Sequence, residues 1–253
     1  MKIYPSDLTD NQWQVIKDLF VYGRKRKHSL RSIVNAILYI TKSGCQWRML
    51  PKDFAPWQTV YYYFRQWKLS GLLEELHDYL VEKVRVQKGR APIPSVGIID
   101  SQSVKTANVC KGEIGYDGGK KIKGGKRHIV VDTLGLLLAI VVHSATPHDS
   151  KAAELVFKTL KNKYIRGIIK IFADGGYRGG LVETARIKFG WALEIVKRNE
   201  THKFKILPKR WIVERTFAWI SFQRRTSKDY ERLTETSTAF VQLSMIRLML
   251  NKF

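Results

Sequence analysis

The chain has 253 residues, of which 45 are Lys or Arg and 22 are Asp or Glu, so its formal net charge is +23 at pH 7. A content of 44% hydrophobic and 26% charged residues is that of a folded globular protein and excludes intrinsic disorder. The longest apolar run, Leu134 to Val142, is too short to span a membrane, and the first residues lack the apolar core of a signal peptide. We therefore expect a cytoplasmic, nucleoid-associated protein whose partner is nucleic acid and not a membrane.

Residues 1–88 are predicted to form a small helical domain. Thr9 and Gln12 have the spacing of a capping box. Ser29 and Gly44 are signals for the beginning and the end of the next helix. Two more helices are expected over 57–69 and 72–86.

Several short helices with an aromatic, basic third helix resemble helix-turn-helix DNA-binding domains. Arg65 and Gln66 on that third helix are the candidates for touching DNA, whereas the neighbouring tyrosines are expected to pack against the domain. A linker over 89–95, which contains glycine and proline, then separates this domain from residues 96–253.

Beyond the linker, short β-branched runs alternate with helical segments. VGIID, RHIVVDT and LLLAIVVH predict three strands, and Leu134 and Gly135 predict a tight hairpin between the last two. Further strands are expected over 168–173 and 193–196, and helices over 151–161, 181–188, around Glu214 and from about 237 to 250. Residues 197–209 are expected to link the last strand to the helix of Glu214. This order indicates a mixed α/β sheet covered by helices.

Three acidic residues stand out in this second part. Asp100 and Asp174 each end a β-branched run, and Glu214 lies inside a helical segment. Strand-end aspartates on neighbouring strands, with a glutamate from a facing helix, supply the oxygen ligands that two Mg²⁺ ions need. Asp132 and Asp149 compete for this role, but they suit a turn and a helix N-cap. The histidines are expected to be structural, and spacing alone leaves the choice among the acids open.

Longer strings narrow that choice. They are IIDSQSVKT, GYDGGKKIKGGKRHIVVDTLGLLL, ADGGYRG and LPKRWIVERTFAWI in the second part, and LTDNQW, HSLRSIVNAILYI and GCQWRMLPKDFAPWQTVYYYFRQW in the first. Over essentially the whole chain, they resemble bacterial insertion-sequence transposases of the DDE type. The resemblance implies an RNase H-like catalytic domain over 96–253 and a catalytic, metal-binding triad of Asp100, Asp174 and Glu214. It also implies a need for Mg²⁺, for which Mn²⁺ can substitute.

The implied function is that of a transposase, which binds the terminal inverted repeats of its insertion sequence and performs metal-dependent DNA cleavage and strand transfer. Its partners would be double-stranded DNA, as transposon ends and as target, and a second copy of the chain in a homodimer or larger assembly. Two alternatives stay open: an RNase H-type nuclease and a non-catalytic, transposase-derived DNA-binding regulator. The helical N-terminal domain argues against the first, and the presence of all three acids argues against the second.

Basic residues near the acids are candidates for binding phosphate. In the wider transposase signature Y-x2-R-x3-E-x6-K, Arg210 and Glu214 match, whereas Leu207 and Ser221 depart from it. Arg210 lies one helical turn before Glu214, so it either binds phosphate or forms a plain ion pair. Residues 105–127 are basic and glycine-rich, and they predict either a flexible loop against DNA or a solvated hairpin. The basic DNA-binding candidates in this part are Lys120, Lys121, Lys123, Lys126, Arg127, Arg210 and Arg215.

Overall fold

The computed structural model describes residues 4–20, 26–107, 114–146, 149–164, 167–177, 179–196 and 209–253. Nearly all of the expected link over 197–209 therefore lies outside the described residues, as do residues 108–113 of the basic segment 105–127. The side chain of Asp149, the expected N-cap, also lies outside the described part.

The N-terminal part is helical, as predicted. Its elements are α1 (Asp10–Ile16), the 3₁₀ turn η1 (Lys17–Leu19), α2 (Leu30–Ser43), the 3₁₀ turn η2 (Trp47–Met49), α3 (Trp57–Leu69) and α4 (Leu72–Gln87). The capping box is confirmed, because Thr9 Oγ1 accepts a hydrogen bond from the Gln12 N–H at 3.1 Å and Gln12 Oε1 accepts one from the Thr9 N–H at 3.0 Å. Ser29 caps α2, and Gly44 ends it with a φ of 71°, a conformation that glycine adopts without a steric penalty.

The second part contains a mixed sheet, also as predicted. Its strands are β1 (Val96–Lys105), β2 (Gly115–Asp117), β3 (Ile122–Val131), β4 (Leu137–Ser144), β5 (Lys170–Ala173) and β6 (Ala192–Ile195). β1 lies between β3, to which it is antiparallel, and β5, to which it is parallel. β4 extends the antiparallel side and β6 the parallel side. The short strand β2 pairs with the beginning of β3 and forms a hairpin, one of the two alternatives for residues 105–127.

β1 is longer than the sequence predicts. The run VGIID predicts that the strand ends at Asp100, but β1 continues to Lys105. The continuation is stabilised by β3, whose antiparallel pairing with β1 extends to Lys105↔Gly124. The parallel pairing with β5 stops earlier, at Ile98↔Phe172. Asp100 therefore lies two residues beyond the end of the parallel pairing and in the middle of the strand.

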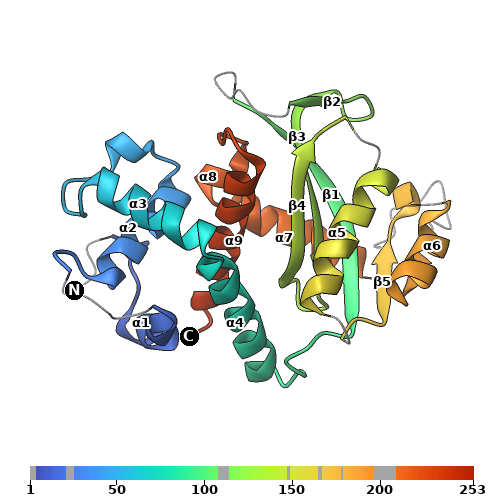
Figure 1. Cartoon of the computed structure of the whole chain (residues 1–253), viewed down its shortest axis with the longest axis horizontal. Helices are drawn as coiled ribbons and strands as arrows, with labels where there is room; N and C mark the ends of the chain where they lie inside the picture. The colour runs from blue at the N-terminus through green and yellow to red at the C-terminus, as the bar shows by residue number, and fades with distance from the viewer. Residues whose placement is uncertain are drawn as a thin grey trace.

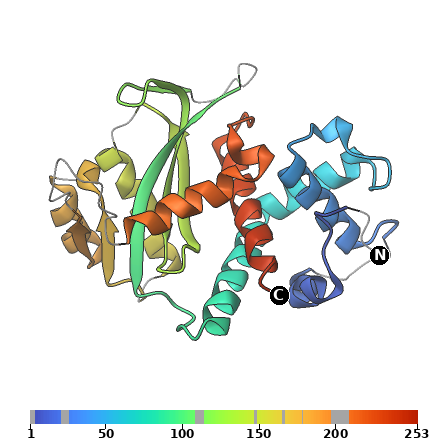
Figure 2. The same cartoon turned by 180° about the vertical axis from the view of Figure 1, so that it is seen from behind.

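Helices cover both faces of this sheet. They are α5 (Asp149–Lys163), the 3₁₀ turn η3 (Gly175–Tyr177), α6 (Leu181–Thr184) with the π-helical turn η4 (Ala185–Phe189), α7 (Arg210–Ser221), α8 (Arg224–Ser227) and α9 (Thr234–Leu250). α5 lies in front of the sheet in Figure 1, and α7 crosses the opposite face, which Figure 2 turns towards the viewer.

The last helix connects the two parts of the chain. α9 packs against α4 and α2 on one side and against β4 on the other, so it lies between the N-terminal helices and the sheet (Figure 1). Buried apolar side chains form one continuous core from the first helices to the sheet. Within the described residues, the helices are too short or too polar to cross a bilayer. The division at 89–95 stays a prediction, with α9 contributing to both sides of it.

Candidate active site

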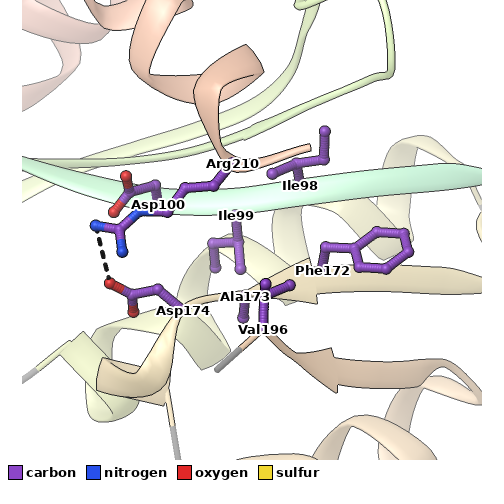
Figure 3. A pocket seen from close by; sticks show the side chains of 8 residues that line it. All are labelled: Ile98, Ile99, Asp100, Phe172, Ala173, Asp174, Val196 and Arg210. Atoms are coloured by element: carbon purple, nitrogen blue, oxygen red, sulfur yellow. Dashed lines mark ion pairs between the residues drawn. The ribbon is translucent and has the colours of Figure 1, made fainter. Parts of the chain in front are cut away.

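Asp100 and Asp174 line one small pocket at the end of the parallel β1–β5 pairing (Figure 3). Asp100 follows Ile98 by two residues, Asp174 follows Phe172 by two residues, and Ile98 and Phe172 are partners in the register. Because parallel strands run in the same direction, both carboxylates emerge at the same edge of the sheet. The structure thus brings these two predicted residues together.

Each of the two carboxylates is oriented by a backbone N–H group. Asp100 Oδ1 accepts a hydrogen bond from the Ser101 N–H at 2.7 Å, and Asp174 Oδ1 accepts one from the Gly176 N–H at 2.8 Å. Burial raises the pKa of Asp100 to about 6, and the charge of Asp174 acts in the same direction, against the hydrogen bond from Ser101 and the positive charge of Arg210. Two neighbouring carboxylates in a partly desolvated pocket form a site that favours a cation.

Arg210 joins Glu214 to this pocket. Arg210 is the first residue of α7, and its Nη2 lies 3.4 Å from Asp174 Oδ2 while its Nε lies 3.1 Å from Glu214 Oε1. Figure 3 shows its guanidinium extending into the space beside Asp100 and Asp174. The Glu214 side chain is 57% exposed and lies at the rim. The i,i+4 ion pair considered from the sequence is therefore present, and Arg210 uses it to bridge two of the three predicted acids.

Carboxylate oxygens are ligands that suit a hard divalent cation, although the three predicted acids do not converge on a single position. Across the described ranges, no three His, Cys, Asp or Glu side chains lie close enough together to hold a metal ion. Mg²⁺ in proteins is commonly bound through one or two carboxylates, with water and substrate phosphate as the other ligands. Asp100 and Asp174 meet that requirement by themselves, and the guanidinium of Arg210 supplies positive charge beside them.

The β2–β3 hairpin brings basic side chains to the same region. Lys120, in the turn of this hairpin, donates from Nζ to the Ser101 carbonyl oxygen at 3.4 Å, and its positive charge lowers the pKa of Asp100 against the effect of burial. Lys121 and Lys123 are exposed next to it. The described residues of the basic segment thus form a hairpin, which corrects the alternative of one flexible loop.

Lys126 and Arg127 are buried, contrary to the expectation that they are available to DNA. Lys126 Nζ lies 3.4 Å from Asp117 Oδ2. Arg127 is only 2% exposed, and its Nη1 donates to the Thr226 carbonyl oxygen at 2.7 Å. Both belong to β3, an interior strand of the sheet whose faces are covered, so their side chains stabilise the protein itself.

Arg215 is also used within the chain. Its Nη2 donates to the Leu134 carbonyl oxygen at 3.0 Å, and its guanidinium lies 4.5 Å from the ring centres of both Trp211 and Trp219. These contacts hold the β3–β4 turn against α7, and the expected DNA contact of this partly exposed side chain stays a prediction. Arg65 and Gln66, in contrast, are exposed on α3.

Lys209 is a residue that sequence reasoning missed. Its Nζ lies 3.9 Å from the centre of the Phe172 ring, which lines the pocket of Asp100 and Asp174. The signal in the sequence was a second basic residue directly before Arg210. Its position adds a further positive charge to the rim of the pocket.

Comparisons with known proteins agree with this architecture. Residues 8–77 match the family model described as "Putative transposase of IS4/5 family", and residues 91–249 match the model "Transposase DDE domain". A Burkholderia cepacia protein, "Putative transposase for insertion sequence element IS402", is 30% identical over 126 residues, which cover 47% of this chain and 60% of that protein. "Uncharacterized protein y4sN" of Sinorhizobium fredii is 30% identical over 84 residues, 32% of this chain and 67% of that protein.

A solved structure, the Drosophila P element transposase strand transfer complex, matches with a TM-score of 0.32 and 16% identity over 73% of this chain and 40% of that chain. This structural similarity is too low to inform the fold. The DDE family model, in contrast, spans more than half of the chain and includes both strands that carry the pocket aspartates. The chain therefore belongs to the family of transposases with a DDE domain, whose catalytic domain has the RNase H-like fold.

Proposed function

We propose that the protein is a transposase that binds the terminal inverted repeats of its insertion sequence, cleaves DNA and transfers the strand. The observation that supports this proposal is the meeting of Asp100 and Asp174 in one pocket at the parallel edge of the sheet, in a chain of the DDE transposase family. Lys120, Lys209 and Arg210 surround this pocket with positive charge. Such charges suit a phosphodiester group whose negative charge increases in the transition state.

Asp100, Asp174 and Glu214 would hold divalent metal ions, Mg²⁺ or Mn²⁺. When bound, such ions activate the attacking oxygen and stabilise the leaving oxygen in phosphodiester chemistry. Burial raises the pKa of Asp100, and a cation bound beside it would favour its ionised form. Glu214 is engaged by Arg210 in the free protein. If the Arg210 side chain leaves Glu214 when a metal ion binds, a DNA phosphate is the partner that Arg210 would then bind.

One pocket serves both reactions because each exchanges one phosphorus–oxygen bond for another. In cleavage, the oxygen of a water molecule bonds to phosphorus, the bond to the 3′-oxygen breaks, and the proton lost by the water balances the proton gained by the leaving oxygen. In strand transfer, the freed 3′-hydroxyl loses its proton and bonds to a target phosphorus, the bond from that phosphorus to the target's own 3′-oxygen breaks, and the released 3′-oxygen takes up a proton. The backbone-oriented carboxylates of Asp100 and Asp174 keep the geometry fixed throughout.

The helical part would recognise the transposon ends through α3. Arg65 and Gln66 are exposed on this helix. Their side chains are types that read guanine and adenine in the major groove. The net charge of +23 adds affinity for phosphate and would keep the protein on chromosomal DNA. Because transposition joins two ends, we infer that the assembly on DNA contains at least two copies of the chain.

A cleavage and joining assay tests this function, with oligonucleotides that carry the inverted repeats flanking the gene and with Mg²⁺ or Mn²⁺ added. Asp100→Asn and Asp174→Asn keep the side-chain shape but remove the charge, so both should lose cleavage and joining while DNA affinity persists. Glu183→Gln, which changes an exposed carboxylate paired with Arg186, should remain active. Full strand transfer by Asp174→Asn would refute the site. Cleavage of RNA–DNA hybrids without preference for transposon ends would favour a nuclease.

A further inference from the structure

A groove separate from the active-site pocket lies between the N-terminal helices and the segment that leads into α9. One wall is formed by residues around η2 and α3, and the other by residues 230–236. The groove is open to solvent and has a volume of about 790 Å³, within the ~300–1,000 Å³ typical of ligand-binding pockets. The volume alone therefore does not select the ligand, and the lining side chains decide which chemistry fits.

Aromatic rings line this groove. Tyr61 and Tyr230 are 42% and 41% exposed, and Trp57 is partly exposed beside them. Tyr61 is held edge-on against Trp47, with ring centres 5.1 Å apart, and Trp47 in turn packs on the buried Phe64. Fixed and exposed aromatic rings are the surfaces on which unpaired bases stack, whereas the bases of a duplex already stack on each other.

The groove also carries a net positive charge. The carboxylate among its lining residues, Glu231, is neutralised by Arg225, whose Nε lies 2.6 Å from Glu231 Oε1. Arg48 and Arg232 are exposed, and neither forms an ion pair with a described acidic residue. The Arg48 guanidinium lies 5.5 Å from the centre of the Trp57 ring, so a cation and a stacking surface stand side by side. This combination matches a phosphate next to a base.

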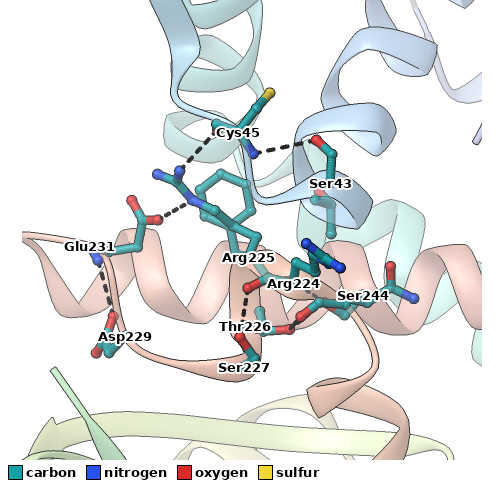
Figure 4. A network of polar contacts seen from close by, with 12 residues as sticks. Ser43, Cys45, Arg224, Arg225, Thr226, Ser227, Asp229, Glu231 and Ser244 are labelled. Atoms are coloured by element: carbon teal, nitrogen blue, oxygen red, sulfur yellow. Dashed lines mark hydrogen bonds and ion pairs between the residues drawn. The ribbon is translucent and has the colours of Figure 1, made fainter. Parts of the chain in front are cut away.

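The wall formed by residues 230–236 is fixed in place by Arg225 (Figure 4). Besides its ion pair with Glu231, Arg225 donates from Nη1 to the Cys45 carbonyl oxygen at 3.3 Å, and its guanidinium lies 4.9 Å from the centre of the Phe240 ring. Both side chains of the ion pair are about nine-tenths buried. The groove is thus preformed, which lowers the entropy cost of binding.

The segment that forms this wall begins beside the strand that carries Asp100. The Asp229 N–H donates to the Lys105 carbonyl oxygen, and the Ala107 N–H donates to the Asp229 carbonyl oxygen, both at 2.9 Å. Lys105 is the last residue of β1. Residues 229–233 therefore run directly from the end of the active-site strand to the wall of the groove.

We propose that this groove binds an unpaired segment of DNA strand at the transposon end or target, with bases on Trp57, Tyr61 and Tyr230 and phosphates at Arg48 and Arg232. The proposal rests on the proposed function, because it assumes a protein that opens or cuts DNA. It adds to that function a site for single-stranded DNA outside the catalytic pocket. Such a site keeps a cut or opened strand on the protein between cleavage and joining.

Fluorescence anisotropy with two labelled DNAs of equal duplex length tests this proposal. One DNA is blunt, and the other carries an overhang of about six unpaired nucleotides, within the range bound by single-strand sites. The wild-type protein should bind the overhang DNA more tightly than the blunt DNA. Trp57→Ala and Tyr230→Ala should each weaken overhang binding by about 5- to 150-fold, the usual effect of losing one stacked base, with little change for blunt DNA.

Two further variants make the test specific. Trp57→Phe retains a ring and should retain most of the overhang affinity, which separates stacking from misfolding. Met49→Ala changes a side chain that is 69% exposed next to the groove but does not line it, and it should bind both DNAs like the wild type.

Equal affinity of wild type and Tyr230→Ala for the overhang DNA would overturn the groove assignment, as would an equal loss for both DNAs. A change in self-association of Tyr230→Ala without a change in overhang binding would also overturn it, because the groove would then hold a second copy of the chain. Failure of the wild type to bind or cleave blunt transposon ends counts against the proposed function instead.

Discussion

Arg85 of α4 and Asp132 of the β3–β4 turn form an ion pair in the interior of the protein, with side chains only 7% and 0% exposed. Burial raises the pKa of Asp132 above its ordinary value, against the hydrogen bond from the Leu136 N–H and the charge and hydrogen bond of Arg85. Arg85 Nε also donates to the Ala91 carbonyl oxygen at 2.8 Å, within the segment between α4 and β1. This pair therefore ties the helical part, the linker and the sheet together.

Removal of Arg85 should be costly because it leaves a buried carboxylate without its partner. We expect Arg85→Met to lower the free energy of unfolding by about 3–5 kcal/mol, measured by urea denaturation. The matched control is Arg31→Met, which breaks an ion pair with Asp10, a residue whose side chain is 88% exposed. That change should lower the free energy of unfolding much less, because water screens an exposed ion pair. Similar small losses in both variants would show that the buried pair contributes nothing special.

The sequence predicted most of the elements because their signals are local. Capping at Thr9 and Ser29 depends on side chains that bond their own helix, and Asp132 was correctly interpreted as a turn residue, since its Oδ1 accepts from the Leu134 N–H at 2.9 Å. The full length of β1 was not predictable in this way. Its second half is a strand only because β3 pairs with it, and that pairing is set by the tertiary fold.

The candidate site was also predictable only in part. The family strings identified the three acids, and the pairing of β1 with β5 brings Asp100 and Asp174 together. The burial of Arg127 could not be predicted from the sequence. A basic residue among glycines is expected to be exposed, and only the packing of the helices on β3 buries this side chain. The sequence did not reveal the groove either, since Trp57 and Tyr230 line it from segments far apart in the chain, and contacts such as those of Arg225 with Cys45 and Glu231 bring these segments together.

The close approach of β1 and β3 depends on Gly124. A Cβ atom at this position would lie 1.9 Å from the Val104 carbonyl oxygen, a backbone atom that cannot move without shifting β1. We expect Gly124→Ala to lower the free energy of unfolding by about 1–3 kcal/mol and to reduce strand transfer, because β1 carries Asp100. Gly118→Ala, where a Cβ meets no atom within 4 Å, should stay within about 0.5 kcal/mol of the wild type. Equal stability of the two variants in urea would contradict the clash.

Arg210 should compete with a metal ion for the carboxylates of the site. Its guanidinium lies 3.4 Å from Asp174 and 3.1 Å from Glu214, and its side chain is 32% exposed. Without DNA, Arg210→Met should therefore raise the affinity for Mn²⁺ by up to about fivefold, measured by calorimetric titration, because an exposed ion pair contributes at most about 1 kcal/mol. The same variant should lose strand transfer if Arg210 binds phosphate. Arg186→Met, which removes an exposed partner of Glu183, should change neither quantity. Weaker Mn²⁺ binding by Arg210→Met would exclude the competition.

His77 of α4 should make the stability of the protein depend on pH. It is buried, its Nδ1 lies 3.0 Å from Asp78 Oδ1, and burial lowers its pKa below the ordinary 6.5 against the opposing charge of Asp78. Below pH 6.5 the unfolded chain thus binds a proton that the folded protein does not. The free energy of unfolding should fall as the pH drops from 6.5 towards the folded pKa, by at most about 1.4 kcal/mol per pH unit from this residue.

Replacement of His77 by leucine tests this assignment, because it removes the titrating group and keeps an apolar side chain in the core. Urea denaturation at several pH values between about 5 and 7.5 should give a flatter pH dependence for His77→Leu than for the wild type. His28→Gln changes a histidine that is partly exposed before α2, and it should keep the wild-type slope. An unchanged slope in His77→Leu would mean that other groups cause the pH dependence. If His77 is buried as a neutral imidazole beside the Asp78 carboxylate, the free energy of unfolding should fall more steeply towards low pH in the wild type than in His77→Leu.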